Sequence, residues 1–252
     1  MAEGRQRKRR KRSRTGRTVY TLVTVVVIIA AIILSITLFF RVSEVKVEGC
    51  VMCDPAAIEA TAGIEKGGNI FTLSKSEISR KIFDAFPWVR EINIKRDVPS
   101  TVVIKVTECQ AIACANSSRG LWIMDENCKL LQTQDEAGAE GLIKILGIDL
   151  LQPVAGDTAA FVENSSLKVP YLRSLLTLLK EREMAGGVTY ISMLYHTNVE
   201  FDYLGRFVVS LGGNVQLEDK IIMLGEVVNN LAPNAEGTID LSNPAEAHFI
   251  PY

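Results

Sequence analysis

Apolar and polar residues divide the chain into one long apolar segment followed by a series of short amphipathic segments. The long segment, residues 19–40, reads VYTLVTVVVIIAAIILSITLFF and contains neither a charged residue nor a proline. At about 1.5 Å per residue, a helix of this length reaches about 33 Å, enough to cross a hydrocarbon core of ~30 Å. The pattern therefore predicts a transmembrane anchor with Val19 and Phe40 at its ends. The next residues lack the small side chains of a signal-peptide cleavage site, which favours an uncleaved anchor.

Residues 42–110 predict a domain with the order strand, helix, helix, strand, strand. Valines alternate with polar residues in 42–49, as in a strand. Asp54 and Pro55 are typical of a helix start, and Gly63 is typical of the end of that helix. Ser74 and Glu77 have capping-box spacing at the start of a second helix. Residues 88–96 and 100–108 alternate again, which predicts two closing strands. The helix residues expected to face the core are Ile58, Ala62, Ile64, Ile78, Ile82 and Phe83.

Residues 111–252 predict a second domain that mixes strands with two helices. Residues 120–131 are expected to form a hairpin whose turn contains Asp125, Glu126 and Asn127. A short strand is expected at 142–147, three more within 186–213, and two at the end of the chain. Helices are expected over 167–184 and 216–231, with apolar stripes formed by Leu172, Leu175, Leu176, Leu179, Leu217, Ile221, Leu224 and Val228. Both domains together give an α+β fold.

The distribution of charge predicts the orientation of the anchor. Residues 1–18 carry nine Lys or Arg and one acidic residue, whereas the remainder has 19 basic and 28 acidic residues. Basic residues beside a span stay in the cytoplasm, so residues 41–252 are expected outside it. Nucleic-acid binding is the alternative use of a basic tail. Topology and attraction to anionic membrane lipid explain the same charges, and we expect no nucleic-acid partner.

Five cysteines follow the predicted span: Cys50, Cys53, Cys109, Cys114 and Cys128. Outside the cytoplasm disulfides are permitted, and an odd number leaves at least one thiol unpaired in a monomer. The Cys50-x-x-Cys53 motif before a helix start raises the alternative of a redox dithiol. The elements that follow do not have the order of a thioredoxin fold. The other interpretation is a simple joint between strand and helix.

The sequence contains no arrangement of residues that indicates catalysis. Its aspartates are scattered near predicted turns and strand ends, where capping is the usual role. Without a second C-x-x-C or a histidine pair beside His196 and His248, no zinc site is expected. We therefore predict a protein that is not an enzyme and has no cofactor, no metal and no small-molecule substrate.

Several motifs resemble the polypeptide-transport-associated (POTRA) domain of the FtsQ/DivIB family of bacterial cell-division proteins. They are Val47 and Gly49 at the end of the first strand, GNIFTLS at 68–74, and FPWVREINIKRDVPSTVVIKVTE at 86–108. Residues 111–252 resemble the β-domain of the same family more loosely, through Trp122, Asp125, Gly147, Leu217-Glu218 and Ile239-Asp240-Leu241. The implied organisation is a basic cytoplasmic tail (1–18), a transmembrane helix (19–40), a POTRA domain (42–110) and an extracytoplasmic β-domain (111–252).

The resemblance implies a single-pass, non-catalytic scaffold of the division machinery. Its expected partners are FtsL-type and DivIC/FtsB-type single-pass proteins, and its location the division septum. The last strand would lend its edge to a partner strand. The matching residues are Ala245, Glu246, Ala247, His248, Phe249 and Ile250.

In the implied POTRA fold the first and last strands run parallel, which brings Cys109 closer to Cys50 or Cys53 than to Cys128 and makes the first three candidates for a disulfide. The alternatives are a membrane-anchored thiol oxidoreductase that uses Cys50 and Cys53, and a POTRA-bearing export or assembly protein. The latter would need a following outer-membrane barrel, for which residues 111–252 offer too few strands.

Overall fold

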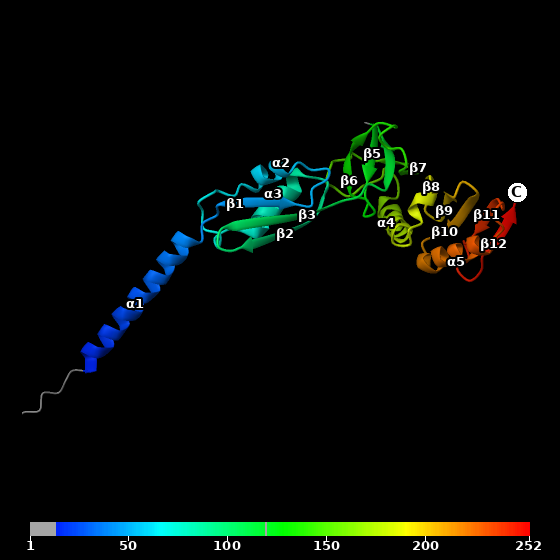
Figure 1. Cartoon of the computed structure of the whole chain (residues 1–252). Coiled ribbons are helices and arrows are strands. Elements are labelled where there is room, and N and C mark those ends of the chain that lie inside the picture. Colours follow the sequence, from blue (N-terminus) through cyan, green and yellow to red (C-terminus); the bar gives the residue numbers. More distant parts are fainter. Residues whose placement is uncertain (1–13, 119) are drawn as a thin grey trace, which may run out of the picture.

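The computed structural model describes residues 14–118 and 120–252, so most of the basic tail predicted at 1–18 lies outside the described residues. Helix α1 (Arg14–Phe39) comes first and leads into two successive domains (Figure 1). Its stretch Thr18–Phe39 is apolar and long enough to cross a membrane, and it is not buried against the rest of the protein. This agrees with the predicted anchor at 19–40.

The first domain has the predicted order of strand, helix, helix, strand, strand. Within residues 44–108, all of which are described, the three strands pair in the order β1-β3-β2. The first and last strands run parallel and the last two antiparallel, as expected. The elements are β1 (Glu44–Glu48), α2 (Pro55–Ala62), α3 (Lys75–Ala85), β2 (Val89–Asp97) and β3 (Thr101–Glu108).

The predicted capping residues start and end these helices. The side chain of Asp54 accepts the N–H of Ala56 at 3.1 Å, and Gly63 ends α2 in the left-handed conformation at φ 61°. Ile78 and Ile82 are buried, as predicted, but Phe83 is exposed, which corrects that assignment. Five residues after Ile78, Phe83 lies roughly 140° around the helix and outside the apolar stripe.

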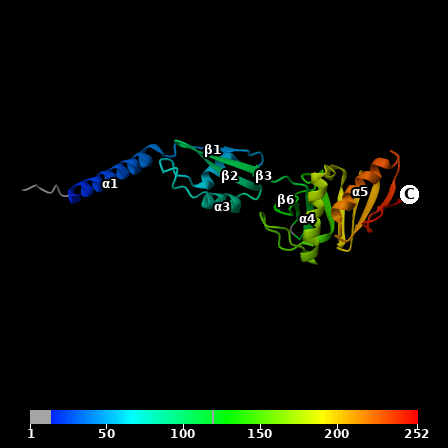
Figure 2. The same ribbon diagram turned by 90° about the horizontal axis from the view of Figure 1, so that it is seen from below.

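The second domain is built on one large sheet. In its described residues nine strands pair in the order β12-β11-β10-β9-β8-β7-β4-β5-β6. Figure 2 shows α4 (Ser165–Glu181) and α5 (Leu217–Asn230) on the same side of this sheet. The leucines predicted on α4 are fully buried between the helix and the sheet. The strands are β4 (Ala113–Ser117), β5 (Gly120–Met124), β6 (Leu130–Gln134), β7 (Ile143–Leu150), β8 (Tyr190–Tyr195), β9 (Asn198–Tyr203), β10 (Phe207–Gly212), β11 (Gly237–Asp240) and β12 (His248–Pro251).

Two strand assignments differ from the sequence prediction. Strand β4 was missed, because its sequence ACANS has mostly small side chains and no clear alternation. The last strand begins at His248 rather than at residue 245. Residues 243–246 form a turn instead, in which Asn243 accepts the N–H groups of Ala245 at 3.1 Å and Glu246 at 3.3 Å. An Asn-Pro pair favours such a turn, so Ala245, Glu246 and Ala247 precede the strand.

Candidate functional site

Strand β12 forms one edge of the large sheet and carries the end of the chain (Figure 1). It pairs antiparallel with β11, with Ile250 opposite Thr238 and His248 opposite Asp240. The N–H of Tyr252 donates to the carbonyl of Glu236 at 3.2 Å. In an antiparallel strand, the backbone groups of every second residue bond to the same neighbouring strand. The backbone N–H and C=O groups of His248 and Ile250 therefore point toward β11, as the N–H of Tyr252 does.

The backbone groups of Phe249 and Pro251 therefore point away from β11, toward the open side. Proline has no N–H. Within β12, all of which is described, the outward hydrogen-bonding groups are thus the N–H and C=O of Phe249 and the C=O of Pro251. An open strand edge of this kind is a template for pairing with another chain.

The side chains of β12 divide between the core and solvent. Phe249 packs against the core, with its ring 6.1 Å from that of Phe207 in an edge-to-face arrangement. Phe249, one of the residues expected to bind a partner, thus has its side chain already engaged within the domain. On the other face Ile250 is 57% exposed, and the exposed His248 lies 3.3 Å from Glu246. Ile250 and His248 are the strand residues whose side chains a partner would meet.

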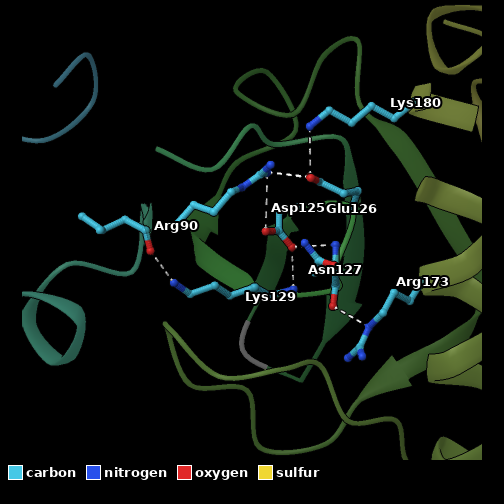
Figure 3. Close-up of polar contacts among 8 residues, drawn as sticks. Arg90, Asp125, Glu126, Asn127, Lys129, Arg173 and Lys180 are labelled. Carbon is cyan, nitrogen blue, oxygen red and sulfur yellow. Dashed lines mark hydrogen bonds and ion pairs between the residues drawn. The ribbon is translucent and has the colours of Figure 1, made fainter. Parts of the chain in front are cut away.

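A second cluster of polar residues lies at the junction of the two domains (Figure 3). The turn between β5 and β6 contains two buried acids, Asp125 and Glu126. One oxygen of Asp125 accepts the N–H groups of Asn127 and Lys129, both at 2.9 Å. This confirms the predicted turn and shows why Asp125 is buried without an unpaired charge.

Glu126 connects the first domain to the second. Its carboxylate lies 2.7 Å from the guanidinium of Arg90 on β2 and 3.1 Å from the ammonium of Lys180 on α4. Burial alone would raise the pKa of Glu126. A backbone N–H and the charges of Lys180 and Arg90 outweigh it, so the pKa lies below its usual value. The carboxylate is therefore held ionised between two cations.

Further contacts fix the same junction. The ammonium of Lys129 donates to the carbonyl of Val89 at 2.9 Å, and the indole N–H of Trp88 donates to Gln132 on β6 at 3.2 Å. Within the second domain, Arg173 on α4 donates to the carbonyl of Asn127 at 3.1 Å and so holds the turn from the other side (Figure 3). Sequence reasoning placed Asp125, Glu126 and Asn127 in a turn but gave no signal for their partners, which lie far away along the chain.

All five cysteines lie among the described residues and are free thiols. The carboxylate of Glu108 accepts the N–H groups of Met52 at 2.8 Å and Cys53 at 2.9 Å. Burial and then Glu108 raise the pKa of Cys53 to about 12, with a smaller contribution from Cys109. Redox-active dithiols of this motif have a lowered thiol pKa, whereas the pKa of Cys53 is raised. A disulfide among Cys50, Cys53 and Cys109 stays a prediction.

The described residues contain no group of three or more His, Cys, Asp or Glu arranged to hold a metal ion. What they offer is an open strand edge at one end, a fixed junction in the middle and an apolar helix at the other end. The fold and these sites define a protein in which a helix long and apolar enough to cross a membrane precedes a first domain of the POTRA type.

Comparison with known protein families agrees with this class. The family "POTRA domain, FtsQ-type" matches residues 40–108. The chain is 30% identical over 112 residues to the cell division protein DivIB of Clostridium acetobutylicum, covering 44% of this chain and 45% of that protein. It is 21% identical over 183 residues to DivIB of Clostridium tetani, covering 73% and 68% of the two chains. It is 26% identical over 101 residues to the cell division protein FtsQ of Corynebacterium glutamicum, covering 38% and 45%.

Residues 40–108 thus match the FtsQ-type POTRA domain, and the chain is similar to DivIB and FtsQ cell-division proteins. The resemblance drawn from its motifs is confirmed. The match to the Clostridium acetobutylicum protein spans less than half of that protein's length.

Proposed function

We propose that this protein is a single-pass membrane scaffold of the bacterial division machinery, without catalytic activity of its own. Its relatives are cell division proteins, which supports a role in division. The observation that carries the scaffold function is the open edge of β12, at the end of the molecule farthest from α1 (Figure 1). In this proposal α1 holds the protein at the septum and the sheet edge holds a partner.

The partner docks by adding a strand to β12. The outward N–H and C=O of Phe249 and the C=O of Pro251 supply the main-chain hydrogen bonds. Ile250 supplies exposed apolar surface, and the exposed pair of His248 and Glu246 selects among partners by charge. The family resemblance implies FtsL-type and DivIC/FtsB-type single-pass proteins as these partners. The opposite edge, β6, already contacts the first domain through Gln132 and Trp88.

In-cell photo-crosslinking tests the docking edge. A photo-crosslinking amino acid replaces Ile250 in one strain and Val215, which is 61% exposed in the loop before α5, in the control. We expect crosslinks to an FtsL-type or DivIC/FtsB-type protein from position 250 and not from position 215. Equal crosslinking from both positions, or crosslinks from position 215 alone, would refute β12 as the docking edge.

A matched pair of substitutions gives a second test. Ile250→Glu should weaken co-purification of the partner, because it places a charge in the proposed interface, whereas Val215→Glu should not. Both positions are exposed, so both variants should keep the thermal unfolding midpoint of the parent protein. Normal partner binding by a folded Ile250→Glu protein would move the docking site elsewhere.

The proposed orientation places both domains outside the cytoplasm, because the basic residues precede the span. A reporter enzyme that is active only outside the cytoplasm should work when fused after Tyr252 and fail when fused after Thr18. The reverse pattern would contradict the orientation.

The thiol oxidoreductase alternative is disfavoured by the raised pKa of Cys53. It makes a separate prediction, because a redox function requires both cysteines of the motif. Replacing Cys50 and Cys53 by Ser should leave division intact if the protein is a scaffold. Loss of division in cells that contain normal amounts of the folded double variant would instead support the redox function.

A further inference from the structure

The first domain is tied directly to the end of the membrane-spanning helix. Helix α1 ends at Phe39, and the next residues already bond to the loop between α2 and α3. The carbonyl of Phe40 accepts the N–H of Ile70 at 3.0 Å. Val42 donates to Gly68 at 2.8 Å and accepts from Gly67 at 2.7 Å. The loop is therefore held within three residues of the helix end.

The turn between β2 and β3 is fixed at the same place. The N–H of Ser43 donates to the carbonyl of Ser100 at 2.8 Å, and the two hydroxyls lie 3.0 Å apart. Figure 1 shows this turn beside the end of α1. Two segments that are distant in sequence thus meet at the point where the chain leaves the span.

Both segments present apolar side chains at this point. Phe71 of the loop is 48% exposed, and Val98 of the turn is 54% exposed. The ring of Phe71 lies 5.2 Å from that of Phe40, the residue after the helix. The polar headgroup layer is about 5–8 Å thick on each side of the hydrocarbon core, so Phe71 lies within one such layer of the helix end.

We propose that this end of the first domain rests in the lipid headgroup layer, with Phe71 and Val98 inserted beside Phe40. Amphipathic and aromatic side chains are favoured at this depth, because it offers apolar contact next to water. Exposed Arg41 follows the span at the depth of the lipid phosphates, and its Nε donates to the carbonyl of Thr37 on α1 at 3.3 Å. The partner of this surface is the phospholipid bilayer itself, a contact beyond the proposed scaffold function.

This contact of Phe71 and Val98 with the bilayer, called the seat here, fixes the direction in which the rest of the molecule extends from the membrane. Strands β1 and β3 both start at this end and run parallel away from it. The loop after β1, with Val51 88% exposed, therefore lies at the opposite end of the domain. Because the ion pair of Glu126 with Arg90 joins the two domains, the large sheet is held in a fixed direction relative to the first domain.

Tryptophan fluorescence in vesicles tests the seat. The full-length protein is reconstituted in phosphatidylcholine and phosphatidylglycerol vesicles, with or without bromine on the acyl chains near the headgroup. Bromine quenches tryptophans that touch the bilayer. Phe71→Trp and Val98→Trp probe the seat, and Val51→Trp is the control at the far end. Native Trp88 and Trp122 give the same background in each protein.

We expect brominated lipid to quench the added emission of Phe71→Trp and Val98→Trp but not that of Val51→Trp or the parent protein. Circular dichroism confirms that each variant is folded. Unquenched emission from both folded seat variants would overturn the proposal. A blue shift without quenching would also overturn it, since protein rather than lipid would then cover the surface. Equal quenching of Val51→Trp would show that the whole domain lies flat on the bilayer, which would contradict a contact at one end only.

Discussion

Glu126→Gln tests whether the two domains are joined by a buried charge cluster. The substitution preserves the shape of the side chain but removes the negative charge between Arg90 and Lys180. The side chain of Glu126 is only 10% exposed, so water cannot replace the lost interactions. The two cations would be left facing a neutral amide.

The expected magnitude follows from the exposure of the partners. A hydrogen bond to a charged group contributes about 1.5–3 kcal/mol. Arg90 and Lys180 are 34% and 30% exposed, which screens part of each interaction. We therefore expect a loss of about 2–4 kcal/mol in the free energy of unfolding, near or below the 3–5 kcal/mol of a fully buried pair.

The matched control is Glu218→Gln, which removes an ion pair between α5 and Arg182, the residue that follows α4, at a similar distance. Glu218 lies 3.2 Å from Arg182 but is 67% exposed, so its loss should cost about 0–1 kcal/mol. Urea denaturation of the full-length protein in detergent micelles, followed by the combined fluorescence of Trp88 at the junction and Trp122 in the large sheet, measures both. Equal small losses for the two variants would refute the view that the junction depends on buried charge.

The dependence on pH gives a second readout of the same site. The pKa of Glu126 is lower in the folded protein than its ordinary value. Its contribution to stability is therefore complete above the unfolded pKa, about 4.3, and is lost as the pH falls through the folded pKa. The parent protein should lose stability over this acidic range, and Glu126→Gln should lose less. An unchanged acid profile in the variant would show that another group controls the acid transition.

Two further predictions concern the first domain. Gly49→Ala should destabilise it by about 1–3 kcal/mol more than Gly67→Ala. Both glycines have φ near 90°, but only at Gly49 would a new Cβ overlap the carbonyl of Val106. Equal shifts of the thermal unfolding midpoint in the two variants would contradict this. Cys53 should react slowly with iodoacetamide at pH 8, because its pKa is about 12 and the thiol is neutral. Glu108→Gln should accelerate the reaction, which mass spectrometry follows. An unchanged rate would exclude Glu108 as a cause of the raised pKa of Cys53.

Local sequence was sufficient for most features that depend on neighbours along the chain. Asp54, Ser74 and Gly63 cap their helices as predicted, because a cap involves residues two to four positions apart. The alternation in β2 and β3 gave both strands and their buried faces. The apolar length of residues 19–40 gave the helix that is long enough to cross a membrane. Local reasoning failed for β4 and for the start of β12, whose small side chains and turn residues carry weak patterns.

The tertiary structure alone decided which distant residues meet. Arg90 and Glu126 are 36 residues apart, and Trp88 and Gln132 are 44 apart, so no local period relates them. Likewise, whether a strand lies at an edge depends on the pairing of all the others. Strand β12 is open because β11 is its only strand neighbour in the described chain. The sequence by itself determined most of the elements and the similarity to the FtsQ/DivIB proteins, whereas the junction and the orientation of Phe249 toward its own core arose only when those elements packed.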